Sequence, residues 1–114
     1  MKTKSFDVLA ARLAMFAAAF GLLYSISFVF LQNNLLSALF LMLGGLAVTV
    51  VMTALYQRLR ETQASYALLG FVLSLAAAAG SLIHGGYDLS NALHPPATIN
   101  LDLPNPVDPR GLLT

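Results

Sequence analysis

Two long stretches of this chain carry no formal charge, and they restrict it to one class of fold. No Asp, Glu, Lys or Arg occurs in residues 13–57, and none occurs in residues 62–87. A helix needs about 20 predominantly apolar residues to cross a hydrocarbon core of about 30 Å. The first stretch is therefore long enough for two membrane crossings, and the second is long enough for one.

The composition excludes a water-soluble globular domain. Hydrophobic residues make up 58% of the chain and charged residues only 10%, whereas soluble domains carry about 25% charged residues. The net charge of +1 and the lack of a basic stripe argue against nucleic-acid binding. The absence of cysteine excludes disulfides, thiolate metal sites and cysteine nucleophiles. The lipid bilayer is thus the expected partner, and no cofactor is implied.

Short polar segments divide the chain into three predicted transmembrane helices, at about residues 13–31, 35–56 and 66–83. Gln32, Asn33 and Asn34 separate the first two and suit the turn of a helical hairpin. Alternation of polar and apolar residues is missing, and isolated strands cannot satisfy their backbone in lipid. We therefore predict an all-α membrane protein with a three-span helical domain over residues 1–94. Residues 95–114 form a proline-rich extracytoplasmic loop and the possible start of a further helix.

The positive charges predict the orientation in a cell membrane. Five of the six Lys and Arg residues flank the first span or lie between the second and third: Lys2, Lys4, Arg12, Arg58 and Arg60. Positive residues mark the cytoplasmic side, which places the amino terminus inside and the carboxyl terminus outside. The first apolar run continues to Leu31, well beyond the ~7–15 residues of a signal-peptide core. It is therefore expected to stay as a membrane span.

Small residues recur at four-residue intervals in all three predicted spans. Such stripes allow close backbone approach, which drives helix association in lipid. They indicate either packing of the three spans on one another, which we favour, or the interface of a homo-oligomer or larger membrane complex. The helix-packing candidates are Ala17, Gly21 and Ser25, then Gly45, Thr49 and Thr53, and finally Gly70, Ser74 and Ala78.

The segment after the third span gathers polar residues and both histidines. In an unbroken helix ending before Pro95, one third of the circumference holds His84, Tyr87, Asp88, Asn91 and His94. This face could bind a metal through His84 and Asp88, completed by His94 or Asn91, or a haem through a histidine. Alternatively, Gly85 and Gly86 break the helix, and a short amphipathic piece lies at the interface. A simpler explanation is that the chain leaves the hydrocarbon here.

The carboxyl-terminal segment carries a resemblance. The sequence HGGYDLSN at residues 84–91, the pair Pro95 and Pro96, and VDPRGLLT at residues 107–114 resemble a junction in bacterial multi-span membrane proteins. There, the Asp-Pro-Arg-Gly run leads into a further span, giving about six in all, and Asp108 followed by Pro109 has the form of a helix start. The resemblance implies that this chain corresponds to the front half of such a protein. That family has no assigned activity, so it implies no catalytic residue.

These observations predict a non-enzymatic integral membrane protein, acting as a helix-packing or accessory subunit or as the front half of a larger protein. A first alternative is a transporter or transporter half that binds substrate where Gly44 and Gly45 break the second span. A second is a redox or metal-binding subunit that uses His84, Asp88 and His94. The span interiors carry no Asp, Glu, Lys or Arg of the kind that proton- and sodium-driven pumps usually contain.

Overall fold

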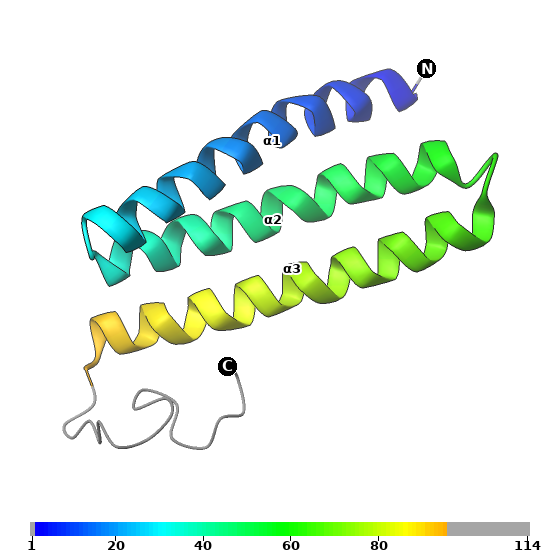
Figure 1. Cartoon of the computed structure of the whole chain (residues 1–114). Helices are drawn as coiled ribbons and strands as arrows, with labels where there is room; N and C mark the ends of the chain where they lie inside the picture. Colours follow the sequence, from blue (N-terminus) through cyan, green and yellow to red (C-terminus); the bar gives the residue numbers. More distant parts are fainter. Residues whose placement is uncertain (1, 96–114) are drawn as a thin grey trace.

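The computed structural model describes residues 2–95, with side chains from Lys4 onward, and consists of three long helices (Figure 1). Helix α1 (Lys2–Ser25) runs directly into the π-helical segment η1 (Ile26–Phe30). Helices α2 (Asn34–Leu59) and α3 (Ala64–Leu93) follow. All three are long and apolar enough to cross a membrane, over Lys4–Phe30, Asn34–Leu59 and Ala64–Leu93. The predicted all-α fold with three membrane helices is confirmed.

Each helix extends beyond the apolar segment that predicted it. Helix α1 begins at Lys2, eleven residues before the predicted span, and α3 continues to Leu93 instead of ending near residue 83. Helical backbone bonds remain favourable where a span enters the headgroup region, so a loss of hydropathy does not end a helix. Helix α3 passes through Gly85 and Gly86 without a break, and α2 does the same at Gly44 and Gly45. Apart from Pro95, the predicted outer loop and further helix start lie outside the described residues.

The helices run antiparallel in chain order, with α2 between α1 and α3 (Figure 1). Within residues 2–95, α2 packs against both neighbours, while the backbones of α1 and α3 do not approach each other. One end of the bundle holds the α1–α2 turn and the last turn of α3, and we call it the amide end. The opposite, charged end holds the α2–α3 turn and an ion pair of 3.0 Å between Arg58 and Asp7.

The helix interfaces are built from small residues. Every buried residue among those with described side chains is an alanine, a serine or a glycine. A soluble protein of this size would bury Leu, Ile and Phe instead, whereas here none of the described Leu, Ile and Phe residues is buried and most are exposed. This distribution fits helices surrounded by lipid, where close backbone contact replaces the hydrophobic effect as the packing force. The buried residues are Ala10, Ser27, Ser37, Ala38, Gly45, Ala47, Ala54, Ala67, Ala78 and Gly85.

The α2–α3 interface repeats at seven-residue spacing. Ala38 and Gly45 on α2 meet Gly85 and Ala78 on α3, in the reversed order that antiparallel helices require. A β-carbon on Gly45 would lie 3.3 Å from the carbonyl oxygen of Ala78, and one on Gly85 would lie 3.0 Å from that of Ala38. Gly85, which the sequence suggested as a helix breaker, is therefore a packing position.

The predicted four-residue stripes are only partly used inside the chain. Gly45 and Ala78 are buried in the α2–α3 interface, but a β-carbon on Gly21 or Gly70 would meet nothing within 4 Å. The hydroxyl-bearing members bond to their own helices. Their acceptors are carbonyl oxygens three or four residues back, for Ser25, Thr49, Thr53 and Ser74. These hydroxyls are thus satisfied without a partner from another helix.

The π-helical segment η1 shapes the turn at the amide end. Its widened hydrogen bonding continues past Phe30, with Leu31 N–H donating to Ile26 at 3.1 Å and Asn33 N–H donating to Ser27 at 3.0 Å. Gln32 then adopts a left-handed conformation with φ of 49°. Ser27 is 2% exposed, so it packs inside the bundle just before the turn. Short π-helical segments of this kind are frequent at functional sites.

Candidate functional site

A polar pocket of about 680 Å³ lies at the amide end, between the α1–α2 turn and the last turns of α3. We call it the amide pocket. Helix α3 contributes one carboxylate and one amide, and the turn contributes three amides. Its lining residues are Phe28, Leu31, Gln32, Asn33, Asn34, Leu35, Ser37, Asp88, Asn91, Ala92 and Pro95. The pocket thus joins residues about sixty positions apart in the sequence.

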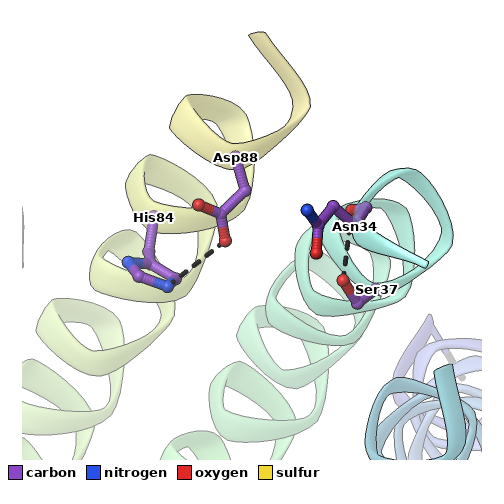
Figure 2. Close-up of polar contacts among 4 residues, drawn as sticks. All are labelled: Asn34, Ser37, His84 and Asp88. Carbon is purple, nitrogen blue, oxygen red and sulfur yellow. Dashed lines mark hydrogen bonds and ion pairs between the residues drawn. The ribbon is translucent and has the colours of Figure 1, made fainter. Parts of the chain in front are cut away.

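Asp88 is the charged member of the pocket. Its Oδ2 atom lies 3.3 Å from Nε2 of His84, one helical turn earlier, and this contact becomes an ion pair when His84 is protonated. The two side chains are 38% and 41% exposed, so neither is sealed from solvent. Figure 2 shows Asp88 on α3 facing Asn34 at the start of α2. The carboxylate is therefore positioned to meet a ligand that enters between the two helices.

The turn amides fix the shape of the opposite wall. The side chain of Asn33 accepts a hydrogen bond of 3.0 Å from the backbone N–H of Leu36, which makes it the N-cap of α2. The Ser37 hydroxyl donates to the carbonyl oxygen of Asn34 at 3.1 Å (Figure 2). These local bonds hold the first turn of α2 in place. The start of α2 also supplies the positive end of a helix dipole to this wall.

Asn91 contributes an unsatisfied donor. Its Nδ2 atom is buried and has no hydrogen-bond partner in the described structure. Buried polar groups are nearly always paired, and an exception needs an explanation such as a missing ligand, ion or water. Asn91 also lines the amide pocket. The unpaired amide therefore makes this pocket a candidate binding site.

The structure brings together part of the predicted polar face. His84 and Asp88 are in contact, and Asn91 lies one turn further along, beside the pocket. His94 is exposed and caps the end of α3. Among residues 2–95, no group of three or more His, Asp or Glu side chains is placed to hold a metal ion. The metal hypothesis therefore gains no third ligand from this arrangement.

Sequence reasoning missed the other half of the pocket. It treated Gln32, Asn33 and Asn34 as a turn alone, whereas the structure places them beside Asp88. A usable signal was present, because consecutive spans usually pack side by side in opposite directions. The start of the second span is therefore expected beside the end of the third. Combining that rule with the polar face of α3 would have joined the two segments.

A second, apolar hollow opens in the middle of the bundle, between α1 and α3 and over α2. We call it the three-helix crevice. It has a volume of about 250 Å³, and small residues from all three helices form much of its wall. Two candidates from the predicted stripe of α1, Ala17 and Gly21, lie in it. The others that line it are Tyr24, Phe40, Leu41, Gly44, Gly45, Val48, Ala77, Ala78 and Ser81.

The fold, the amide pocket and the three-helix crevice define a helical protein with three membrane-spanning candidates, a polar pocket at one end and a small-residue crevice at mid-length. No protein-family model, curated protein or solved structure matches the chain. What the protein does must therefore be inferred from this geometry.

Proposed function

We propose that this protein is a non-catalytic helix-packing module of a cell membrane, which assembles with further membrane helices. The partner helices belong to a second copy, to another subunit, or to the rest of a larger multi-span protein whose front half this chain forms. The charged end lies in the cytoplasm and the amide end outside, because positive residues favour the cytoplasmic side.

The observation that carries this proposal is the open three-helix crevice. Gly21 and Gly44 lie in its wall, and a β-carbon on Gly21 would meet nothing within 4 Å. Small residues at a helix surface permit close approach of a neighbouring helix. Because α1 and α3 do not close over α2, a partner helix can insert its side chains there. Flexible lipid chains would fit the shape of such a hollow less closely than the side chains of a partner helix.

The unbroken helices favour this role over transport. The transporter alternative required a break at Gly44 and Gly45 that exposes backbone groups to a substrate. Helix α2 is continuous there, and Gly45 is packed against Ala78. The crevice walls therefore present side chains instead of unpaired backbone groups.

Site-directed photo-crosslinking tests the proposal. The chain has no cysteine, so a single Gly21→Cys variant can carry a thiol-reactive photo-crosslinker into native membranes. Crosslinks to protein are expected from position 21, because the partner helix covers it. They give adducts of higher mass where the partner is a second copy or another subunit, and crosslinked peptides within one chain where it is the rest of a larger protein. The matched control is Gly80→Cys, at an exposed glycine of α3 outside the crevice. Adducts with lipid alone at position 21, or equal protein adducts at both positions, would contradict the assembly role.

A further inference from the structure

The three-helix crevice continues along α2 as a longer groove. Toward the charged end, a hollow of about 200 Å³ opens between α1 and α2, and another of about 210 Å³ opens between α2 and α3. Leu41 and Val48 line the crevice, and Leu55 lines both of the other hollows. Residues seven apart are close to two full turns apart in a helix, so one face of α2 forms a common floor. We call the three hollows together the α2 groove.

Small residues form both walls of the α2 groove with one shared spacing. On each wall helix, four of them follow one another at intervals of four, three and four residues, which keeps them on one helix face. They are Ala10, Ala14, Ala17 and Gly21 on α1, and Gly70, Ser74, Ala77 and Ser81 on α3. Two different helices thus present the same pattern of small residues to the groove.

The two stripes lie at the same level of the bundle. A β-carbon on Gly44 would lie 3.6 Å from Cβ of Phe20 on α1. A β-carbon on Gly45, the next residue, would lie 3.3 Å from Cβ of Ser81 on α3. Gly21, which follows Phe20, is therefore nearly level with Ser81. Because α1 and α3 both run antiparallel to α2, they run parallel to each other (Figure 1), and the stripes stay level along their length.

Equal spacing at equal level is what a two-fold symmetric pair requires. Two copies that insert in the same orientation are related by an axis along the membrane normal, and rotation about it leaves every residue at its level. With the two grooves face to face, α1 of each copy lies on α3 of the other, and the matching stripes meet. Such an interface uses the same surface patch on both copies. An unrelated partner helix would require no match between α1 and α3.

The floor and the size of the groove fit the same arrangement. The two α2 helices run parallel across the axis, so that Leu41, Val48 and Leu55 each meet their own counterpart. An apolar seven-residue repeat is typical of parallel helix pairs. At about 30 Å³ per water molecule, each hollow equals about seven or eight waters. It therefore accommodates side chains of an opposing face and not a whole inserted helix.

The charges at the groove are compatible with self-association. Among the described residues that line it, Asp7 and Arg58 carry the formal charges, and they form an ion pair of 3.0 Å with each other. Like charges that face each other across an interface oppose association. Because the two charges of the groove are already paired, no unpaired charge is brought against its like in a second copy.

We propose that the α2 groove binds a second copy of this chain about a two-fold axis along the membrane normal, with α1 against the α3 of the second copy and α2 against α2. The proposal rests on the assembly role and names its partner. The small residues of the stripes allow α1 and the facing α3 to approach closely, which is how helices associate in lipid. Two three-helix layers then cover both grooves.

Crosslinking between full-length copies with different epitope tags tests the arrangement. The chain has no cysteine, so a short bismaleimide in native membranes reacts only at introduced thiols. Gly21→Cys on one copy should link to Ser81→Cys on the other, and Val48→Cys should link to itself across the axis. The matched controls are Gly80→Cys, next to Ser81 but outside the groove, and Leu46→Cys, at an exposed position of α2 outside the groove. The crosslinked product should be lost in both.

The two independent sets of cysteines protect the test against one misfolded variant. Stronger product between two Gly21→Cys copies than between Gly21→Cys and Ser81→Cys, or equal product at the control positions, would overturn the arrangement. No product from either set, or photo-adducts of Gly21→Cys with a different protein or within one chain, would overturn the second copy as partner and leave the assembly role intact. The absence of any protein photo-adduct at position 21 would remove both.

Discussion

A β-carbon on Gly85 would lie 2.7 Å from Cγ of Met42, so α3 crosses α2 here more closely than a residue with a side chain allows. The carbonyl oxygen of Ala38, at 3.0 Å, closes the same space from the backbone side. Met42 can move its flexible side chain, but the helix backbone can yield only by separating the helices. Gly85 therefore determines how tightly α2 and α3 pack below the amide pocket.

Replacing Gly85 with alanine should lower the free energy of unfolding by about 1–2 kcal/mol, because overpacking outweighs the better helix propensity of alanine. Gly86→Ala is the matched control, since a β-carbon there meets nothing within 4 Å. It should be neutral or stabilising by up to about 1 kcal/mol. Unfolding in mixed detergent micelles measures both variants. Equal stability of the two would show that the close approach at Gly85 is not required.

The ion pair between Arg58 and Asp7 should contribute little to stability. Its side chains are 67% and 32% exposed, and exposed pairs contribute about 0.2–1 kcal/mol. A double-mutant cycle with Arg58→Gln and Asp7→Asn should give a coupling energy in that range, which falls when salt screens the charges. A coupling that is independent of salt would mean that the pair is sealed from solvent in the membrane.

The N-cap of α2 should matter more than that ion pair. Asn33→Ala removes the acceptor for the Leu36 N–H and should destabilise the protein by about 1 kcal/mol, as lost N-caps do. Gln32→Gly is expected to relieve strain in the same turn. The φ of 49° at Gln32 is unfavourable for any residue with a β-carbon. That variant should be neutral or more stable. Thermal unfolding of both variants in one detergent provides the comparison.

The membrane helices follow from charge-free stretches alone, because a buried charge in lipid is unfavourable enough to leave a clear pattern. The packing surfaces were less predictable. Four-residue stripes identified Gly45 and Ala78 but also Gly21 and Gly70, where an added β-carbon would meet nothing within 4 Å. Small residues permit close approach without specifying which neighbour makes it. That choice depends on how α1 and α3 are placed around α2.

Only the α3 side of the amide pocket was predictable from the sequence, because the facing wall again depends on how the helices are placed. Helical periodicity placed His84, Asp88 and Asn91 on one face, and in the structure the first two are in contact. The turn amides on the facing wall could not be assigned from periodicity, because a turn has none. Their position depends on the π-helical segment η1 and on the left-handed Gln32. Neither feature has a sequence signature as clear as an apolar span.

The orientation proposed from the positive residues predicts opposite labelling of the two ends. Single cysteines at Ser5 and Ser90 would lie at exposed positions near the charged end and the amide end, respectively. In intact cells, a membrane-impermeant maleimide should label Ser90→Cys at once and Ser5→Cys only after permeabilisation. The reverse pattern would invert the topology. Labelling of both sites from one side would contradict a three-crossing arrangement.

Filling the three-helix crevice should separate assembly from folding. A leucine at Gly21 meets nothing within 4 Å at its β-carbon, and leucine favours helices more than glycine does. Gly21→Leu should therefore leave the stability of the monomer unchanged or raise it by up to about 1 kcal/mol. It should nevertheless weaken association by about tenfold or more, because the partner helix loses its close approach. Native electrophoresis of gently solubilised membranes measures the fraction that migrates in the larger complex.

Gly80→Leu provides the control for that experiment, since Gly80 also has free space at its β-carbon but lies outside the crevice. Both variants add the same apolar side chain to a membrane helix, so a general effect of bulk or hydropathy would act equally on the two. Loss of the complex in Gly21→Leu alone would locate the partner at the crevice. Equal loss in both variants, or none in either, would contradict assembly through this surface.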